Sequence, residues 1–310
     1  MGRALLIRKW KCKKRSIRGT VAANIITKNE QKTIVRCIRS VQDVVDEIIV
    51  VDTGSTDDTM IKAINAGARI GQIKWNDDFS APRNKAIELS GTDWILSIDA
   101  DEVLPERGKE EIREMASMPQ VAGWHIDTMT YLKSSMQLNV QVNNKKYKEG
   151  SEFPYYVIST KTRMFQKREG IRWRFPVHEL IDTSIIEAGG KFRKAEIKMQ
   201  HIHKEGTKED LQKKGEFYLR LCEKKVRDNP DMGHAWGELA VCELQSGLFM
   251  RAARSYWQAI TKGENNSRNR YGYAGVLRLL GQVELSDLEI ERAICMDFPN
   301  LTHIEMRGKQ

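Results

Sequence analysis

The sequence predicts a Rossmann-like α/β domain with a mostly parallel sheet, followed by an all-α module of helical repeats. Over the first hundred residues, short β-branched runs alternate with amphipathic stretches, which is typical of strands joined by crossover helices. From about residue 208 the strand pattern stops, and small residues recur with the period of a tetratricopeptide unit. The 310 residues also suffice for two domains of roughly 150 residues.

The α/β domain is expected over residues 20–207, after a basic arm over 1–19 and before the helical module over 208–310. Because the strands alternate with helices, we expect parallel pairing with right-handed crossovers. The run at 48–51 is apolar at every position, which predicts a central strand covered on both faces. The expected elements are strands at 20–26, 47–51, 68–74 and 93–98 and helices at 30–41, 57–66 and 82–89.

Acidic residues follow two of these strands. Asp52 ends the second strand, and Asp99, Asp101 and Glu102 come directly after the strand at 93–98. Ligands of open α/β sheets gather beyond the carboxyl ends of strands, so these side chains are candidates for a ligand site. Residues 120–200 are expected to form strands and loops of mixed polarity.

The helical module contains a repeat of the tetratricopeptide type. Its small residues allow two helices of one unit to approach closely, and its aromatic residues fill the gaps between units. A further helix over 209–227 is expected to stack as a leading half-unit. The pattern consists of Trp236, Leu239, Ala240, Gly247, Ala252, Tyr256 and Ala259, and Ala274, Gly281 and Ala293 follow one period after Ala240, Gly247 and Ala259.

The positive charge is concentrated near the start of the chain. The formal net charge is +9, and residues 1–19 carry eight Lys or Arg and no acid. This arm is either a solvated tail or a contact for nucleic acid, an acidic membrane surface or another anionic partner. A second basic surface is expected between Lys145 and Arg174, where nine basic residues face three acids.

Cysteine usage and hydropathy indicate a cytoplasmic protein. The five cysteines are scattered and odd in number, without Cys-x-x-Cys or Cys/His ligand spacing, so we expect a reducing compartment and no zinc finger. No apolar run approaches the roughly 20 residues of a membrane span, and no convincing signal peptide is present. With 40% hydrophobic and 30% charged residues, a disordered or collagen-like chain is excluded.

Three features predict chemistry. Asp99 and Asp101 lie two residues apart and project to one side of an extended segment, where they suit Mg²⁺, Mn²⁺ or Ca²⁺. Alone, such a pair is more often part of a surface loop, but three acids after an apolar strand need a cation, basic side chains or water to compensate them. Asp52 is expected either to accept from a nucleobase or to form a turn. The third feature is the segment Trp75-Asn-Asp-Asp-Phe-Ser-Ala-Pro-Arg-Asn84. Its purely structural interpretation is an aromatic loop that caps the following helix.

In combination, four segments resemble glycosyltransferase family 2 with its GT-A fold. They are Thr27-Lys-Asn-Glu30, Val51-Asp-Thr-Gly-Ser-Thr-Asp57, the tryptophan segment above and Ile98-Asp-Ala-Asp-Glu102. The branch that bears tetratricopeptide repeats and includes bacteriocin peptide S-glycosyltransferases is the most similar. The resemblance implies inverting sugar transfer from a nucleoside diphosphate sugar, with a UDP-sugar favoured, and a divalent cation, Mn²⁺ or Mg²⁺.

The resemblance also assigns roles to particular residues. It places Glu30 and Asp52 at the nucleoside, Arg83 and Asn84 at the nucleotide, and Asp99 and Asp101 at the metal that bridges the diphosphate.

Two histidine-containing segments offer further candidates. In Arg172-Trp-Arg-Phe-Pro-Val-His-Glu-Leu-Ile181, Glu179 is the preferred general base and His178 is its rival. The structural alternative is that the two side chains hydrogen-bond to each other in a loop. In Gln200-His-Ile-His203, we prefer His203 to His201 as a third metal ligand or diphosphate contact. Here the sequence departs from the family pattern, because the aromatic residue that normally follows the histidine is missing.

The leading hypothesis is a metal-dependent inverting glycosyltransferase whose helical repeats present a peptide or protein acceptor. A second hypothesis keeps the donor chemistry and places a hydroxylated DNA base or a saccharide at the acceptor site. A third is a non-catalytic interaction protein built on the repeats, with oligomer formation through the helical module left open. The sequence does not name the sugar or the acceptor atom.

Overall fold

A computed structural model describes residues 19–135, 139–202 and 207–297. His203 and nearly all of the basic arm lie outside these ranges. The described chain divides into two compact units. The first unit contains residues 19–71, 86–135, 139–171 and 184–202, and the second contains 72–85, 172–183 and 207–297.

The first half of the sheet is parallel, as predicted. Strand β1 (Val21–Thr27) pairs in parallel with β2 (Glu47–Asp52) on one side and with β4 (Trp94–Ser97) on the other, and β3 (Arg69–Gln72) lies beyond β2. Every residue of β4 is buried, as are all but one of β1, so these strands are covered on both faces.

Helices connect these parallel strands. They are α1 (Ile34–Val41), α2 (Thr59–Asn65) and α3 (Ser80–Leu89). Helix α1 buries Ile34, Cys37, Ile38 and Val41, which recur every three or four residues and therefore form one apolar face. This face joins the core that includes alternate residues of β1.

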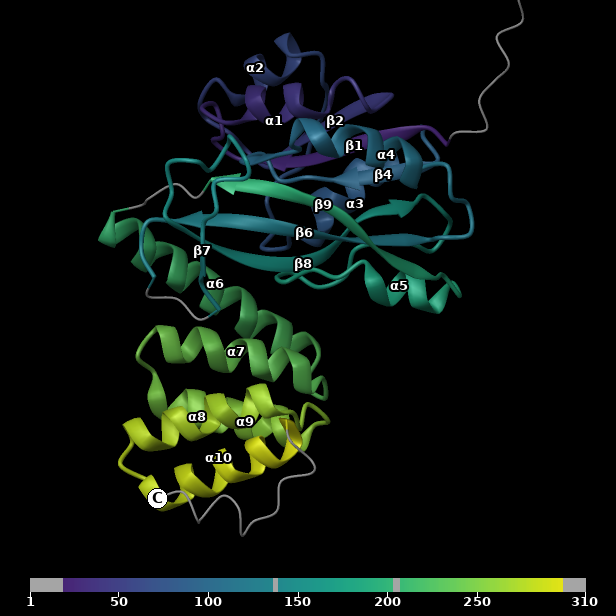
Figure 1. Ribbon diagram of the computed structural model, residues 1–310. Coiled ribbons are helices and arrows are strands. Elements are labelled where there is room, and N and C mark those ends of the chain that lie inside the picture. Colours follow the sequence, from purple (N-terminus) through teal and green to yellow (C-terminus); the bar gives the residue numbers. More distant parts are fainter. Residues whose placement is uncertain (1–18, 136–138, 203–206, 298–310) are drawn as a thin grey trace, which may run out of the picture. The chain divides into compact units, whose positions relative to one another are not determined.

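The second half of the sheet is mixed, and the direction of its strands had no sequence signal. Strand β8 (Tyr155–Gln166) is antiparallel to β4 and to β6 (Gly123–Leu132), while β9 (Phe192–Ile202) is parallel to β6. Figure 1 shows β6, β8 and β9 side by side. The other elements here are β7 (Gln141–Val142), a 3-10 turn η1 (Glu106–Gly108) and helices α4 (Lys109–Met115) and α5 (Asp182–Glu187).

The sheet curls, and β4 and the strand that follows it in sequence do not pair with each other but are separated in the strand order. The order runs β3-β2-β1-β4-β8-β6-β9-β5, and β5 (Glu102–Val103) pairs with β9 although it follows β4 closely in sequence. The acidic turn between β4 and β5 therefore bridges three intervening strands. This path brings residues of β8 and β9 to the turn.

The helices of the second unit confirm the repeat. Helix α7 starts at residue 233 and α9 at 267, and α8 starts at 249 and α10 at 283, so both pairs are offset by the same period. Gly247 and Gly281 occupy matching turns with φ of 73° and 76°. The helices are α6 (Lys208–Asp228), α7 (Gly233–Gln245), α8 (Phe249–Thr261), α9 (Ser267–Leu279) and α10 (Val283–Asp297).

Two segments that precede the helices in sequence pack within this second unit. Trp75 and Phe79 contact Phe217 of α6, with ring centroids 5.9 and 6.2 Å away. The amide of Phe79 donates to the carbonyl of Pro176 at 2.9 Å, so the segments 72–85 and 172–183 are also joined to each other. The tryptophan segment is thus part of an aromatic core around α6.

Among the described residues, no helix has the length and apolar character of a membrane span. The longest, α6, has 21 residues but is rich in lysine and glutamate. Four described cysteines, Cys37, Cys222, Cys242 and Cys295, are free thiols.

The contact between α8 and α9 predicts opposite effects for two glycine substitutions in α9. A Cβ atom at Gly272 would lie 2.4 Å from the buried ring of Tyr256, whereas one at Gly275 meets nothing within 4 Å. We expect Gly272→Ala to lower the free energy of unfolding by about 1–3 kcal/mol through overpacking. Gly275→Ala should raise it by about 0.5–1 kcal/mol because alanine favours helices. Urea unfolding monitored by circular dichroism tests this, and equal stabilities would contradict the packing.

Candidate functional site

The turn after β4 holds three acidic side chains in the first unit. The Asp99 amide donates to the Glu102 carboxylate at 2.9 Å, and the Glu102 amide donates to the Asp99 carbonyl at 2.9 Å. These bonds close the turn. Glu102 is buried, while Asp99 and Asp101 keep about 30% of their side chains exposed. The two candidate metal ligands are therefore the accessible members of the acidic group.

Arg163 of β8 neutralises part of this acidic turn. Its Nη1 lies 3.2 Å from Asp99 Oδ2 and its Nη2 lies 2.5 Å from Glu102 Oε1. The register Leu96↔Met164 carries this arginine to the end of β4. Sequence reasoning counted Arg163 in a basic surface, but only 4% of its side chain is exposed. It is a buried counter-ion.

His201 of β9 lies against Asp101. Its Nε2 is 3.2 Å from Asp101 Oδ2, and its Nδ1 is 3.1 Å from the Thr130 hydroxyl. The registers Glu102↔His201 and Thr130↔His201 place the ring there. Burial opposes the charge of both partners, yet their hydrogen bond outweighs it, so the pKa of Asp101 lies below its usual value and the pKa of His201 above.

Asp52 shapes the turn after β2. Its Oδ2 accepts from the amides of Gly54 and Ser55, each at 2.9 Å, and its Oδ1 accepts from the Ser55 hydroxyl at 2.5 Å. Gly54 has a φ of 108°, which suits glycine. Asp52 is thus a turn-forming residue in this structure, and its carboxylate is held in one orientation.

Glu30 lies in the same unit as Asp52. Its Oε2 accepts from the Thr33 hydroxyl at 2.6 Å, and its amide donates to the Thr59 hydroxyl at 2.7 Å. These bonds fix the loop that connects β1 to α1.

Arg83, Asn84 and Glu179 form a second group, within the second unit. Arg83 Nε lies 2.6 Å from Glu179 Oε1, and its guanidinium lies 5.1 Å from the centre of the Trp173 ring. Asn84 exchanges two hydrogen bonds with the backbone of Trp173, at 2.8 and 3.0 Å. The start of α3 is thereby fastened to segment 172–183, and the side chains of Arg83 and Glu179 are mostly buried.

His178 does not pair with its neighbour Glu179. Its imidazole lies with Cys222 and Cys242, and its ligand atoms are within 4.8 Å of theirs. Of the predicted residues, Asp99 lies with Asp101, Arg83 and Asn84 lie with Glu179, and His178 lies with two cysteines. Glu30 and Asp52 each fix a loop of the first unit. Sequence reasoning missed Arg163 and the cysteines, and it ranked His201 below His203, which is outside the described residues.

Comparison with known proteins identifies the family. The sequence model of glycosyl transferase family 2 matches residues 23–184, which is more than half of the chain. The chain therefore belongs to this family.

Individual relatives and solved structures are similar to this chain over different lengths. A TPR repeat-containing protein of Synechococcus elongatus is 32% identical over 84% of this chain and 61% of its own length. The SPbeta prophage-derived glycosyltransferase SunS of Bacillus subtilis is 32% identical over 52% of this chain and 34% of its own. The chain thus spans less than two thirds of either relative. S. aureus TarS in complex with UDP-GlcNAc is 14% identical, with 94% and 92% of the chains covered and a TM-score of 0.49.

The buried ion pairs of Arg163 predict a large loss of stability when the arginine is removed. Arg163→Met leaves the Glu102 carboxylate buried without its counter-ion, which should cost about 3–5 kcal/mol of unfolding free energy. Adding Glu102→Gln to this variant should restore part of the loss. As a control, Arg113→Met removes the exposed pair with Asp46, at 3.1 Å, and should cost about 1 kcal/mol or less. Denaturant unfolding measures all three, and equal costs for the two arginines would refute the buried pair.

Proposed function

We propose that the chain transfers a sugar from a nucleoside diphosphate donor, with inversion and with a divalent cation, to a peptide or protein side chain. Membership of glycosyl transferase family 2 supports the donor chemistry. The observation that supports the divalent cation is the accessible pair Asp99 and Asp101 with His201 beside it.

The metal site of this proposal consists of Asp99, Asp101 and His201. Carboxylate oxygens and an imidazole nitrogen suit Mn²⁺, and they also accept Mg²⁺ when oxygen ligands predominate. Adjacent ligands of an octahedral ion lie about 3 Å apart at bond lengths near 2.1 Å, and Asp101 Oδ2 lies 3.2 Å from His201 Nε2. Asp101 and His201 therefore lie at a spacing that suits neighbouring ligands of one ion. His203 remains a further proposed ligand.

The surrounding residues prepare this site for its ligand. A metal ion would displace the Nε2 proton that bonds to Asp101, and a Thr130 hydroxyl that accepts from Nδ1–H would then keep the Nε2 lone pair available to the ion. Arg163 fixes the orientation of the Asp99 carboxylate. When bound, the cation stabilises the negative charge that develops on the leaving diphosphate without needing a proton.

The nucleoside is assigned to Asp52 and Glu30, and the nucleotide to Arg83 and Asn84. Each carboxylate oxygen of Asp52 has two lone pairs, so the turn leaves acceptor capacity for the N–H of a uracil-type base. Arg83 offers a planar fork of donors that matches phosphate geometry. A UDP-sugar is therefore the proposed donor.

Glu179 is the proposed general base, which takes a proton from the acceptor as the anomeric carbon is attacked. Arg83 holds the Glu179 carboxylate in place through Oε1. His178, the alternative base, faces Cys222 and Cys242 instead. This arrangement favours Glu179.

The acceptor is assigned to the helical module. Repeat arrays bind extended segments along their surfaces, and several large apolar side chains of α8–α10 are exposed. They are Phe249, Met250, Trp257, Tyr271, Leu279, Val283, Leu285, Leu288 and Met296. A peptide with apolar residues would cover part of this surface.

Removal of the two metal carboxylates should abolish metal-dependent donor binding. We expect Asp99→Asn combined with Asp101→Asn to eliminate the gain in UDP affinity that Mn²⁺ gives, because neutral amides do not balance the charge of the cation. Isothermal titration of UDP with and without Mn²⁺ measures this. Asp43→Asn is the matched control, since Asp43 is an exposed partner of Lys109 in the same unit. A Mn²⁺ effect that survives in the double variant would overturn the assignment.

Loss of the base should remove transfer and preserve donor affinity. We expect Glu179→Gln to lower the transfer rate by about 10²–10⁴-fold. Glu223→Gln, which breaks another ion pair of the second unit, with Arg251, should leave it unchanged. Intact-mass analysis follows transfer from a mixed pool of UDP-, GDP- and dTDP-sugars to peptides containing Ser, Thr or Cys, with hydroxymethylated DNA as a second acceptor. Modification of the DNA alone would refute a peptide acceptor.

A further inference from the structure

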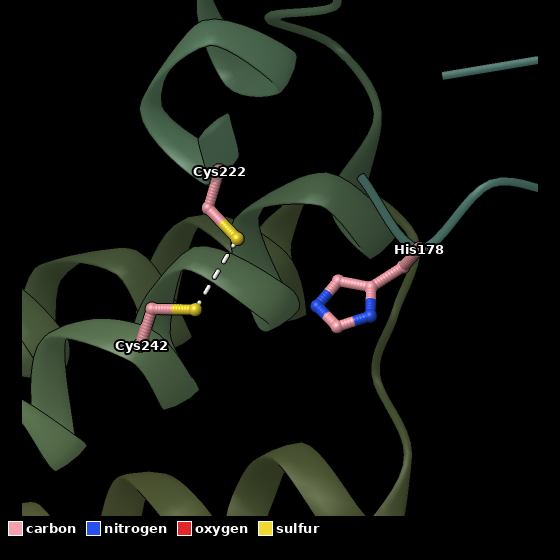
Figure 2. A group of neighbouring side chains, drawn as sticks. All are labelled: His178, Cys222 and Cys242. Atoms are coloured by element: carbon pink, nitrogen blue, oxygen red, sulfur yellow. Dashed lines mark hydrogen bonds between the residues drawn. The ribbon is translucent and has the colours of Figure 1, made fainter. Parts of the chain in front are cut away.

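A cluster of soft ligands lies in the second unit, apart from the residues assigned to donor and base. His178 comes from segment 172–183, Cys222 from α6 and Cys242 from α7. Their ligand atoms lie within 4.8 Å of one another, and the two sulfur atoms are 3.2 Å apart. Figure 2 shows the imidazole directed toward the two thiols. Three separate segments thus converge on one point.

The cluster combines an apolar setting with access from solvent. Both cysteines are buried, and they pack in a core with Val177, Leu221 and Leu239. His178 is exposed. The histidine of the cluster therefore reaches the surface, while the two sulfur ligands lie in the apolar core.

Charge in the neighbourhood is already balanced. The fully buried Lys225 ammonium lies 2.6 Å from Glu238, which also accepts from His234 at 3.0 Å. Lys225 in addition donates to the Val177 carbonyl at 3.2 Å. Two thiolates would consequently bring a charge of minus two into this core, and a divalent cation would cancel it.

One thiol is prepared for ionisation. The hydrogen bond with Cys222 and then that with His178 lower the pKa of Cys242 to about 6, despite burial. The same hydrogen bond is the main cause that raises the pKa of Cys222.

We propose that His178, Cys222 and Cys242 bind a thiophilic divalent cation, Zn²⁺ in the first instance, with a fourth position for water or another ligand. Tetrahedral bonds of about 2.3 Å to sulfur and 2.0–2.1 Å to nitrogen separate the ligand atoms by roughly 3.5–3.8 Å. The sulfur atoms need to move apart by only about half an ångström. The ion would join segment 172–183 to α6 and α7.

The geometry of His178 agrees with this role. Its φ of 47° lies in the left-handed region, which non-glycine residues seldom occupy. This conformation turns the imidazole toward the cysteines, whereas the next residue, Glu179, is directed to Arg83. A metal ion at His178 would therefore hold the backbone next to Glu179.

Cobalt spectroscopy on the full chain tests the site directly. Reduced, metal-free protein titrated with Co²⁺ should show the visible bands of tetrahedral cobalt and the ultraviolet bands of cobalt thiolates, saturating at about one equivalent and displaced by Zn²⁺. Because this readout uses the unaltered chain, it does not depend on the folding of a variant. Absence of thiolate bands would overturn the proposal.

Variants assign the ligands. Cys222→Ser and Cys242→Ser should each lose the thiolate bands in part and bind Zn²⁺ much more weakly, and His178→Asn should weaken binding with both thiolates retained. Cys37→Ser and Cys295→Ser are matched controls that keep the site, as is the variant of Asp99 and Asp101. Zinc content unchanged in the first two variants would refute the assignment.

A disulfide is the competing outcome for the same two cysteines. Maleimide labelling of protein unfolded without reductant distinguishes the two states. Ready labelling of Cys222 and Cys242 once a chelator is present is expected for the metal site. Labelling that requires a reductant would assign a disulfide and overturn the proposal.

Discussion

The buried guanidinium of Arg163 is the interaction on which the first unit depends most. Three carboxylates within four residues follow a fully buried strand, and their mutual repulsion in a poorly solvated place would oppose folding. Arg163 offsets this charge by contacting Asp99 and Glu102 at once. Glu102 takes the shorter contact and is buried, so it is the structural acid of the turn. The more exposed Asp99 and Asp101 are the carboxylates that we propose for the cation.

Local patterns were sufficient for the parallel half of the sheet and for the helical repeats. The continuous apolar run at 48–51 reports burial on both faces, and a strand of this kind needs no information from distant residues. The helical repeat is equally local, because each unit repeats the same close approach between its two helices. The mixed half of the sheet is different. Strand β8 joins β4 to β6, and nothing within its own sequence gives the direction of either pairing.

The same distinction explains which site residues were missed. Asp99 and Asp101 stand together in the sequence, so spacing identified them, whereas Arg163 and His201 reach them only through the registers of β8 and β9. The choice between His201 and His203 could not be made from alternation, since residues two apart are expected to project to the same side of an extended segment. The cysteine cluster was excluded by spacing, because Cys222 and Cys242 are 20 residues apart on different helices. Ligand spacing rules apply to ligands carried by short loops. They do not detect ligands that are brought together by the packing of two helices.

Ligand chemistry separates the two proposed cation sites. Asp99 and Asp101 offer hard oxygen atoms that suit Mn²⁺ or Mg²⁺, and Cys222 and Cys242 offer soft sulfur atoms that suit Zn²⁺. By the usual order of affinities, zinc binds more tightly than manganese at almost any protein site. A strong chelator would remove both ions. Loss of activity in its presence would therefore not reveal which of the two sites is needed. Restoring Mn²⁺ alone to chelated protein separates the roles, because manganese binds poorly to thiolates and should refill only the carboxylate site.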